Sequence, residues 1–488
     1  MNLDSLLRGV DYRLLQGGER EIGGICADSR EAAPGSLFVC IRGLRDDARR
    51  FIPDAVARGA AAIVVDADAP PVDASTAVLR VGDSRSALSF IASNFYGNPD
   101  AGLRVHGITG TNGKSSTAFF LQALLEAGGR RTGLIGTVET RVGREPLDIA
   151  FATSTTPDPI ELMSILAEMR GRGAVDAVME VSSHSLALRK LDAMSFRTAV
   201  FTNLTQDHLD LHGDMEAYKA TKLRLFSLCE TGIVNADDPA SGDFMRAAAG
   251  RVSSFGIREA ADLAAEGVEC GAGGVSFGLV AGRERLGRFS VPIPGRFTVY
   301  NSLGAIAAAL SEGLDPRVIR ERLSRMEAVP GRIQSIAHDG GFSVFVDYAH
   351  TPDGLENIIS AVREFTAGRV ITVFGCGGDR DRAKRPLMGE ISGRLSDITV
   401  ISSDNPRSED PEAIMAEIEA GMEGGERVLE ADREEAIALA ISMAAAGDSV
   451  IIAGKGHESS QVFADRTLPF DDVEVARRIL TDGYYSPT

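Results

Sequence analysis

The 488-residue chain is predicted to be a multidomain α/β protein, and three observations support this class. Its length exceeds what one hydrophobic core usually organises, so two to four domains are expected. Short apolar runs typical of strands alternate with helical stretches along nearly the whole chain, which indicates mainly parallel sheets. Hydrophobic residues at 44% and charged residues at 25% are ordinary for a globular protein.

Two turn-rich segments divide the chain. Tyr96–Asp100 has the sequence YGNPD, and Val329–Arg332 has the sequence VPGR. Glycine, proline and asparagine in such clusters are typical of linkers, because they favour turns and interrupt helices and strands. The two segments predict three domains, at residues 1–98, 99–330 and 331–488.

Composition excludes several classes of function. Acidic residues outnumber basic ones by 69 to 51, giving a formal charge of −18, which argues against non-specific nucleic-acid binding. The five cysteines show no zinc-binding spacing and indicate reduced thiols. The start, Met1–Asp4, lacks the features of a signal peptide, and the apolar stretch Ala436–Ala446 is too short to span a bilayer. We therefore expect a cytoplasmic protein with no membrane insertion.

A glycine-rich segment predicts a nucleotide site. Gly107–Ser116 has the sequence GITGTNGKSS, follows a predicted strand and precedes a helical run through Leu125. Backbone N–H groups and the helix N-terminus at such a junction can cradle phosphates. We expect Lys114 to reach the β- and γ-phosphates and the Ser115 hydroxyl to bind Mg²⁺. Ile108 stands where the strict P-loop pattern has glycine, yet a chance turn would not combine this strand, loop and helix.

Polar residues follow the next two predicted strands. Glu180 lies in the apolar run Ala177–Val181 and suits a Mg²⁺ ligand of the Walker-B kind, with a capping or surface glutamate as the alternative. His184 follows this run, and His208 follows the next run, Ala199–Leu204. Polar clusters at successive strand ends are typical of a site. His208 could complete a hard-cation site with Glu180, since no thiolates are present to favour structural zinc.

Together these segments resemble the Mur ligase family of peptidoglycan precursor synthesis. The matching motifs occur in family order over nearly the whole chain, which is far more specific than the glycine loop alone. They are TGTNGK at 109–114, EVSSH at 180–184, the segment 203–213, NADDP at 235–239, Tyr300-Asn301, VPGR at 329–332 and DYAHTPD at 347–353.

The resemblance implies an architecture and a reaction. A UDP-binding α/β domain comes first, a central P-loop ATPase domain second and a Rossmann-like domain last, in a monomer. ATP would phosphorylate a carboxylate of the UDP-linked substrate, and an amine would then displace phosphate from the acyl-phosphate. The protein would contribute positioning and charge neutralisation around the transferring phosphoryl group.

The resemblance also implies roles for individual residues. Arg332 is expected near the ATP phosphates and Asp347 near the ribose. The whole set implied at ATP is Gly110, Thr111, Asn112, Gly113, Lys114, Ser115, Ser116, Asn301, Arg332 and Asp347. The set implied at the UDP-linked substrate is Ser29, Thr155, Thr156, Ser182 and Lys190. Without the resemblance, Ser29 and the two threonines would be ordinary turn residues.

Two positions depart from the family pattern. Leu44-Arg45 follow Gly43, where family members often carry His-Gln. Leu188-Arg189-Lys190 stand where some members have Gln-x-Arg, so Lys190 would replace a planar guanidinium by a point charge. Details of uridine and peptide binding are therefore not carried over from the resemblance.

Lys222 lies in a predicted helix, one turn after Tyr218 and on the same face. A solvated surface lysine is the ordinary interpretation. By similarity to the family, Lys222 is instead carbamylated by CO₂, which converts a cation into a carboxylate-like Mg²⁺ ligand. Burial beside a metal site could lower the pKa of the amine enough for that reaction.

The C-terminal third points to the amine substrate. Gly375–Pro386, Asp404-Asn405-Pro406-Arg407 and GKGHE at 454–458 resemble the tripeptide-forming members that add meso-diaminopimelate. The carboxylate that lysine lacks calls for a guanidinium, which can bind it bidentately. Arg407 and Arg385 are the candidates, with Glu458 or Asp404 for an ammonium. The implied amine-binding set is Arg385, Asp404, Asn405, Pro406, Arg407, Gly454 and Glu458.

Four alternatives differ in what they predict. The same ligase could use L-lysine, but Arg407 favours diaminopimelate. Folylpolyglutamate synthetase, a more distant relative, should lack the N-terminal UDP-binding segment. A P-loop ATPase of another kind would turn over ATP without a small amine. A nicotinamide-dependent oxidoreductase, suggested by the glycine turn at 375–378, would carry a reducible cofactor.

Overall fold

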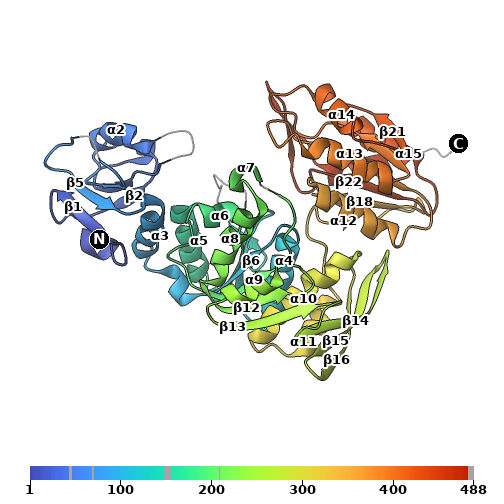
Figure 1. Ribbon diagram of the computed structural model, residues 1–488, viewed down its shortest axis with the longest axis horizontal. Helices are drawn as coiled ribbons and strands as arrows, with labels where there is room; N and C mark the ends of the chain where they lie inside the picture. The colour runs from blue at the N-terminus through green and yellow to red at the C-terminus, as the bar shows by residue number, and fades with distance from the viewer. Residues whose placement is uncertain (43–46, 69–70, 148–154, 208, 482–488) are drawn as a thin grey trace.

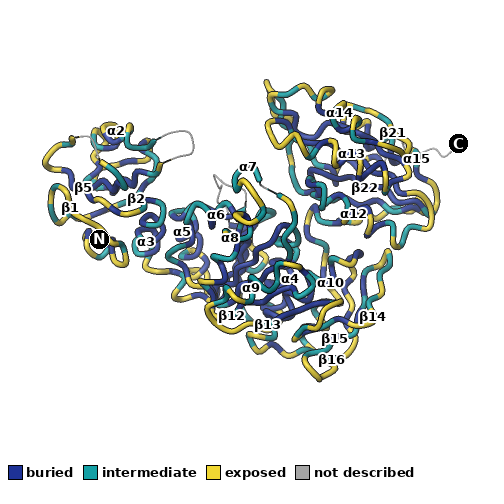
Figure 2. Tube along the Cα trace, viewed as in Figure 1, coloured by how far each residue is buried: buried dark blue, intermediate teal, exposed yellow. Residues whose placement is uncertain are grey.

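In the computed structural model, the described residues are 1–488 except 43–46, 69–70, 148–154, 208 and 482–488. They form three lobes in chain order, each built around a sheet, with the central lobe touching both others (Figure 1). The buried residues lie along the strands and on the inner faces of the helices (Figure 2). The predicted α/β class with mainly parallel sheets is confirmed.

The N-terminal sheet has five strands among the described residues, and all its pairs are parallel except β1 with β5. In spatial order they are β1 (Tyr12–Gln16), β5 (Ala77–Val81), β4 (Ala62–Val65), β3 (Ser36–Val39) and β2 (Gly24–Cys26). Its helices are α1 (Leu3–Leu6), α2 (Ile52–Ala57) and α3 (Ser84–Phe95). Helix α3 begins at the capping side chain of Asp83 and buries Leu88 and Ile91 on one face.

The central sheet is parallel through its middle and antiparallel at both edges. Its described strands in spatial order are β16 (Glu284–Val291), β15 (Gly274–Ala281), β14 (Leu263–Gly271), β13 (Arg251–Gly256), β12 (Cys229–Asn235), β11 (Phe196–Phe201), β6 (Arg104–Thr109), β10 (Asp176–Glu180), β7 (Thr132–Ile135), β8 (Thr140–Val142) and β9 (Glu145–Pro146). Strands β6, β10 and β11, whose apolar runs predicted them, are adjacent at its centre. They are buried almost throughout, as expected for strands covered on both faces.

Helices cover this sheet and are joined to its strands by loops (Figure 1). They are α4 (Lys114–Ala127), α5 (Pro159–Gly171), α6 (Ser183–Ala187), α7 (Leu209–His212), α8 (Met215–Phe226), α9 (Ser241–Ala247), α10 (Arg296–Ser311) and α11 (Pro316–Leu323). The alanine-rich face of α10 packs against α4, since small side chains let the two backbones approach. This packing holds the start of α4 in place.

The C-terminal sheet is parallel apart from its first short pair. Its described strands in spatial order are β17 (Gln334–Ser335), β18 (Ser343–Asp347), β22 (Ser449–Ala453), β19 (Val370–Phe374), β20 (Ile398–Ile401) and β21 (Glu426–Leu429). The other elements are α12 (Pro352–Arg363), α13 (Lys384–Leu395), α14 (Pro411–Glu419), α15 (Arg433–Met443), α16 (Asp472–Thr481) and the hairpin β23 (Ser460–Val462) with β24 (Thr467–Pro469). Residues 436–443 of the apolar stretch lie in α15, which buries Ala436, Ile437, Ala440 and Ile441 on one face.

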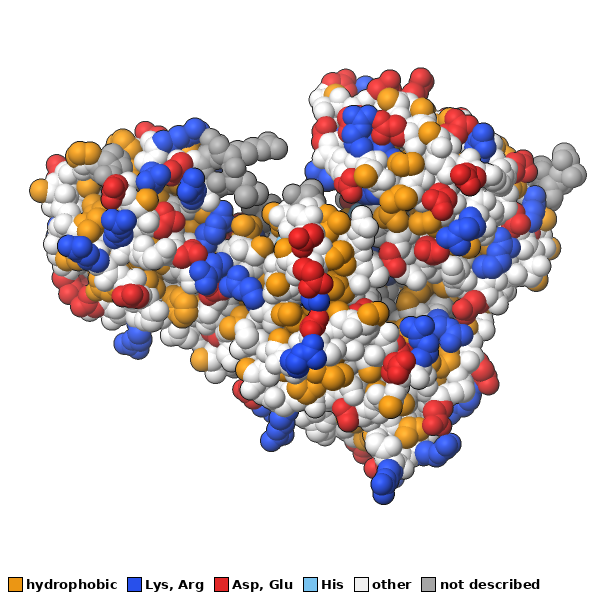
Figure 3. Space-filling model, viewed as in Figure 1, with side chains coloured by type: hydrophobic (Ala, Val, Ile, Leu, Met, Phe, Trp, Pro, Cys, Tyr) orange, Lys and Arg blue, Asp and Glu red, His pale blue; other side chains and the backbone are white. Residues whose placement is uncertain are grey.

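The outer surface agrees with the composition. Cationic and anionic side chains are interspersed over the face seen in Figure 3, which is hollowed between the C-terminal lobe and the rest. Within the described residues, no helix is both long enough and apolar enough to cross a membrane.

Candidate functional site

The phosphate loop lies between β6 and α4 and requires glycine at two positions. Gly110 and Gly113 both have positive φ, at 152° and 83°. A Cβ atom at Gly110 would lie 1.8 Å from the Thr202 hydroxyl, and one at Gly113 would lie 2.3 Å from the Asn301 side-chain oxygen. The loop is therefore pressed against neighbouring residues and opens at the N-terminus of α4, where backbone N–H groups are available to an anion.

Two lysines converge on this loop from different helices. Lys114 Nζ donates to the carbonyl oxygens of Gly110 at 3.0 Å and Thr111 at 2.8 Å. Lys222, from α8, donates to the same Gly110 oxygen at 2.8 Å and lies over the ring of Tyr218 at 4.6 Å. Burial lowers the pKa of Lys114. Burial, followed by the charge of Lys114, lowers the pKa of Lys222 well below its usual value.

Neither ammonium forms an ion pair with a carboxylate of the described residues. Two desolvated cations that share one carbonyl are unfavourable in the absence of an anion. The loop therefore attracts an anion locally, although the protein as a whole carries a net charge of −18 and repels anions. Local donors decide the electrostatics of this site.

Glu180 ends β10 beside the loop and is oriented from both sides. Its Oε2 accepts a hydrogen bond from Ser115 Oγ at 3.0 Å, and its Oε1 accepts one from Thr137 N at 2.8 Å. A Cβ atom at Gly136 would lie 2.4 Å from that Oε1, so the backbone closes tightly around the carboxylate. Ser115 and Glu180 thus present adjacent hard oxygen atoms, which is the donor type that Mg²⁺ prefers.

The C-terminal lobe contributes the other side of the site. The guanidinium of Arg332 lies over the Tyr348 ring at 4.6 Å and reaches Ser115 Oγ at 3.4 Å. Its buried Nε has no hydrogen-bond partner among the residues that the structure describes. Asp347 accepts from the backbone N atoms of Ile333 at 2.7 Å and Ala349 at 2.9 Å. Burial raises the pKa of Asp347.

These groups surround one cavity of about 630 Å³ between the central and C-terminal lobes, a size suited to a nucleotide. The predicted residues that line it are Thr111, Asn112, Gly113, Lys114, Ser115, Ser116, Thr155, Glu180, Ser182, Lys222, Asn301, Arg332 and Asp347. Residues far apart in the sequence are therefore brought together here. His208 lies outside the described residues, and the described part contains no cluster of three His, Cys, Asp or Glu able to hold a metal.

Three residues of the site were given no role by sequence reasoning. Asn203 accepts from Asn112 N at 2.9 Å and fixes the loop from the end of β11. Tyr300 OH donates to Asp237 at 2.7 Å, and both line the cavity. All three belong to motifs that carry the family resemblance. The sequence therefore identified the motifs, but it did not predict the contacts that these side chains make.

The residues expected at the UDP-linked substrate lie in two places. Thr156 Oγ1 donates to the Glu180 carbonyl at 2.9 Å and accepts from Ser182 N at 3.1 Å, so this segment adjoins the nucleotide cavity. Ser29 is buried in a short turn of the N-terminal lobe and does not line that cavity. Leu44-Arg45, where the family pattern departs, lie outside the described residues.

Lys190 has a partner that its sequence did not predict. Its Nζ lies 2.6 Å from Asp158 Oδ1, and the side chain is buried. Asp158 caps α5 just after Thr155 and Thr156, and Lys190 follows the turn after α6. The ammonium therefore ties two segments of the expected substrate site together.

Two of the three C-terminal segments expected at the amine, residues 404–407 and 454–458, meet at one edge of their sheet. Asn405 Nδ2 donates to Glu458 Oε2 at 2.7 Å, and Lys455 Nζ donates to both Asn405 Oδ1 and Glu458 Oε2 at 3.1 Å. A Cβ atom at Gly454 would lie 2.6 Å from Asp404 Oδ2. These residues follow β20 and β22, at the carboxyl end where open α/β sheets bind ligands.

The two candidate arginines differ in availability. Arg385 is fully buried, and its guanidinium donates to Glu409 at 2.8 and 3.0 Å and to Glu417 at 2.8 Å. Arg407 has a positive φ of 52° and donates through Nη1 to the Gly378 carbonyl at 2.8 Å. Its backbone is held by the bond from its N to Val462 O at 3.0 Å. The carbonyl of Pro406 blocks any side chain at Gly378, where a Cβ atom would lie 1.9 Å away.

Three features define an α/β protein of the phosphoryl-transfer class: a phosphate loop at a helix N-terminus, two lysines that form no ion pair within the described part of the chain, and an oriented carboxylate at the carboxyl edge of a parallel sheet. Residues 21–96 match the description Mur ligase family, catalytic domain; residues 108–309 match Mur ligase middle domain; residues 331–456 match Mur ligase, glutamate ligase domain. The chain belongs to the Mur ligase family.

Relatives cover the chain from end to end. A protein of Syntrophomonas wolfei named UDP-N-acetylmuramoyl-L-alanyl-D-glutamate--2,6-diaminopimelate ligase is 45% identical over 98% of this chain and 99% of its own length. Proteins with the same name from Caldanaerobacter subterraneus and Clostridium botulinum are 43% and 40% identical, over 99% of this chain and 100% of their own lengths.

Solved structures agree with the fold. One described as UDP-N-acetylmuramoyl-L-alanyl-D-glutamate--2,6-diaminopimelate ligase superposes with a TM-score of 0.69 at 30% identity, covering 95% of this chain and 96% of that one. A MurF ligase of Thermotoga maritima in complex with ADP has a TM-score of 0.62 at 20% identity, covering 94% and 97%. At that identity the second likeness shows the fold alone.

Proposed function

We propose that this chain is an ATP-dependent ligase that joins meso-diaminopimelate to the D-Glu side-chain carboxylate of UDP-N-acetylmuramoyl-L-Ala-D-Glu. One observation carries the phosphoryl-transfer part: Lys114, Lys222 and Arg332 converge on one cavity beside the oriented carboxylate of Glu180. The names of relatives that match the whole chain support the substrates. The protein would work in the cytoplasm as a monomer.

The chemistry follows from the groups around the loop. A carboxylate oxygen is a poor leaving group until it is phosphorylated, so ATP activates the substrate and phosphate later departs. Lys114 and Arg332 would neutralise charge on the transferring phosphoryl group, and the loop N–H groups would hold its position. Ser115 and Glu180 would hold Mg²⁺, which supplies further neutralisation when bound. Asn301 and Asp347 would contact the rest of the nucleotide.

The three lobes would divide this work. Residues 1–98 would bind the UDP part with Ser29, and residues 99–330 would bind ATP and the reacting carboxylate with Thr155, Thr156 and Ser182. Residues 331–488 would bind the amine. This division is supported by the three separate sheets and by the cavity between the second and third lobes.

Lys222 would act after reaction with CO₂. The neutral amine attacks the carbon of CO₂, a new C–N bond forms, and a proton is released to leave a carbamate. Two features support this reaction: the amine is buried, and its pKa is well below the usual value, so the neutral nucleophile is available. Carbamylation would replace a cation that repels Lys114 by an anion. The carbamate oxygens could then act as metal ligands near Ser115 and Glu180.

Carbamylation can be tested without measuring turnover. Protein incubated with ¹³C-bicarbonate should show a carbamate carbon resonance that is absent in Lys222→Ala and present in Lys219→Ala, a surface lysine on the same helix. The same spectrum for wild type and Lys222→Ala would contradict the assignment.

Arg407 would select the amine. Its guanidinium would hold the carboxylate that lysine lacks, with Asp404, Asn405 and Glu458 near the ammonium. Loss of a buried contact of this kind costs roughly 2–5 kcal/mol, because the partner charge is left unpaired. The mutant Arg407→Ala should lose kcat/KM for meso-diaminopimelate while the KM values for ATP and the UDP-linked substrate change little. Equal use of diaminopimelate by both proteins would remove Arg407 from the amine site.

Arg385 provides a matched comparison within the same lobe. Because Glu409 and Glu417 already form ion pairs with its two terminal nitrogens, Arg385→Ala should lower stability as well as activity. A purely catalytic loss in Arg385→Ala would instead place that arginine at the substrate.

The proposed reaction is tested by phosphate release with UDP-N-acetylmuramoyl-L-Ala-D-Glu, ATP and Mg²⁺. We expect release to depend on meso-diaminopimelate, to be far lower with L-lysine, and to match the amount of amide product seen by mass spectrometry. ATP turnover that is independent of any amine would favour a P-loop ATPase of another kind. Preferred use of lysine would overturn the substrate assignment alone.

A further inference from the structure

Asp353 joins the C-terminal lobe to the phosphate loop. It lies in the first turn of α12, partly buried, and lines the nucleotide cavity. Its Oδ2 accepts a hydrogen bond from the side-chain amide of Asn112, in the loop, and another from Thr205 Oγ1 at 3.1 Å. Both donors belong to the central lobe, on the segments that follow β6 and β11.

The two donors are themselves fixed to the loop. Asn112 N donates to Asn203 Oδ1 at 2.9 Å, and its carbonyl accepts from Asn203 Nδ2 at 3.1 Å. Thr205 N donates to Thr111 Oγ1 at 3.0 Å, and that hydroxyl donates back to the Thr205 carbonyl at 3.0 Å. The two donors therefore face Asp353 together when the loop has this shape. Asp353 contacts an ordered loop and not two independent surface groups.

Local helix chemistry accounts for only part of this arrangement: the Asp353 side chain also interacts with Asn357 on its own helix, but that contact does not explain the two hydrogen bonds from the central lobe. Thr351 already caps α12 by accepting from Gly354 N at 3.1 Å, and an acidic residue in the first turn stabilises a helix while remaining in solvent. Asp353 is instead drawn into the junction, where burial raises its pKa. A carboxylate beside a phosphate site is also electrostatically unfavourable.

We propose that Asp353 is a positioning residue whose carboxylate fastens the C-terminal lobe to the phosphate loop. The lobe that carries the expected amine site is thereby aligned with the site of phosphoryl transfer. The inference rests on the proposed ligase function for its kinetic consequences, but the fastening itself is a property of the fold. Displacement of a reacting group by about 1 Å can cost on the order of 10² in rate.

The kinetic test compares Asp353→Ala, Asp353→Asn and the control Asp339→Asn, an exposed carboxylate of the same lobe. We expect Asp353→Ala to raise the KM for the amine at least tenfold and to lower kcat. The KM for the UDP-linked substrate, bound in the other lobes, should stay within a few-fold. Asp353→Asn should recover most of the loss, because a carboxamide oxygen accepts the same hydrogen bonds. A uniform rise in all KM values, or an Asn variant as poor as Ala, would overturn the proposal.

A second measurement does not depend on any reaction. Fluorophores placed on the central and C-terminal lobes report the distance distribution between them in the presence of ADP. Asp353→Ala should show a broader distribution, with more separated lobes, than wild type and Asp339→Asn. Identical distributions would overturn the fastening role. If wild-type protein ligates no amine, the proposed function fails while this measurement still decides the role of Asp353.

Discussion

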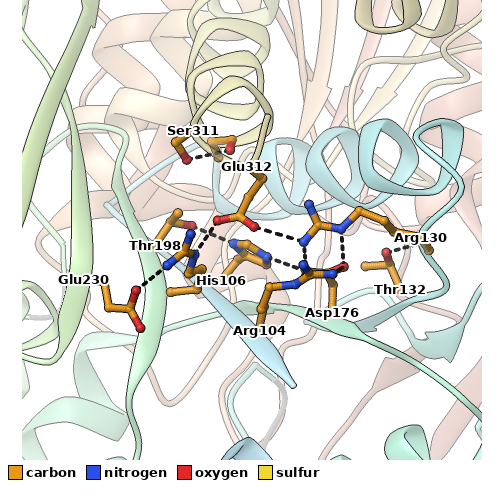
Figure 4. A network of polar contacts seen from close by, with 11 residues as sticks. Arg104, His106, Arg130, Thr132, Asp176, Thr198, Glu230, Ser311 and Glu312 are labelled. Atoms are coloured by element: carbon orange, nitrogen blue, oxygen red, sulfur yellow. Dashed lines mark hydrogen bonds and ion pairs between the residues drawn. The ribbon is translucent and has the colours of Figure 1, made fainter. Parts of the chain in front are cut away.

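Charged residues cluster at both the amino and the carboxyl ends of the central parallel strands. The two clusters differ in whether their charges form ion pairs. At the amino end, buried Asp176 meets Arg104 at 3.0 Å, Arg130 at 2.7 Å and His106 at 3.1 Å (Figure 4). Arg130 continues to Glu312 at 3.0 Å. At the carboxyl end, by contrast, the lysines of the phosphate loop donate to backbone carbonyls and face no described carboxylate within ion-pair distance.

This difference separates a structural cluster from a ligand site. A buried network whose charges are all matched stabilises one arrangement of strands and helices, and it gains little from a ligand. Desolvated cations without a partner are costly and persist where an anion is bound in function. Residue types alone do not make this distinction, since both ends contain buried acidic and basic residues. Pairing in three dimensions does.

The largest effect on stability is expected at the amino end. In Asp176→Asn, Arg104 and Arg130 lose a buried charged partner, although Arg130 keeps Glu312. Breaking a buried pair in this way costs about 3–5 kcal/mol of unfolding free energy. Urea denaturation monitored by circular dichroism measures the change. Nucleotide affinity of the folded fraction should be retained.

Asp243→Asn is the matched control, because Asp243 pairs with Lys219 and Arg246 at the surface. Exposed pairs of this kind contribute about 0.2–1 kcal/mol. Equal losses of unfolding free energy in the two variants would mean that the amino-end network stabilises the fold no more than a surface ion pair does.

The next effect is catalytic and belongs to the carboxyl end. Lys114→Ala removes one preorganised donor from the phosphoryl-transfer site, which lowers kcat about 10²–10³-fold, or roughly 3–4 kcal/mol. Phosphate release under saturating substrates measures it, with Lys219→Ala as the control. Stability should change little or rise, because a desolvated cation is lost. If Lys114→Ala loses as much stability as Asp176→Asn and keeps near-normal turnover, Lys114 is a structural residue and not part of a ligand site.

A pH titration sharpens the comparison further. Burial alone would raise the pKa of Asp176, but hydrogen bonds from His106 and Arg130 outweigh it and lower the pKa to about 2. The ionised carboxylate therefore stabilises the fold fully above about pH 4, and this contribution is lost as the pH falls toward 2. The unfolding free energy of Asp176→Asn should fall less over that interval than that of wild type. Parallel curves would exclude Asp176 as a source of acid sensitivity.

The smallest effect is expected at the edge of the same network. His106 Nδ1 lies 2.9 Å from Thr198 Oγ1, and both side chains are buried. Thr198→Val keeps the shape and removes the partner, leaving a buried ring nitrogen unsatisfied at a cost of about 1–3 kcal/mol. Thr221→Val provides the control, because Thr221 is a half-buried threonine on α8 whose hydroxyl bonds Ala217 O at the surface. Denaturation midpoints that coincide for both variants would show that the ring nitrogen is satisfied in another way.

The fold was predictable because its signals are local. The continuous apolar runs at 370–374 and 398–401 form β19 and β20, since strands buried on both faces have continuous apolar sequences. The strand, glycine loop and helix around Lys114 were predicted from ten consecutive residues. Tyr218 and Lys222 share a helix face because their spacing of four residues sets it.

The sequence by itself thus determined the α/β class, the phosphate loop and the residue types gathered at the strand ends. Only the tertiary structure decided which charges are matched: Lys190 by Asp158, Arg385 by Glu409 and Glu417. It also placed Asp353, 241 residues away in the chain, against Asn112. The physical reason is range. Backbone conformation and periodicity depend on neighbours a few residues apart, whereas ion pairing and desolvation depend on distances that exist only once the lobes have packed together.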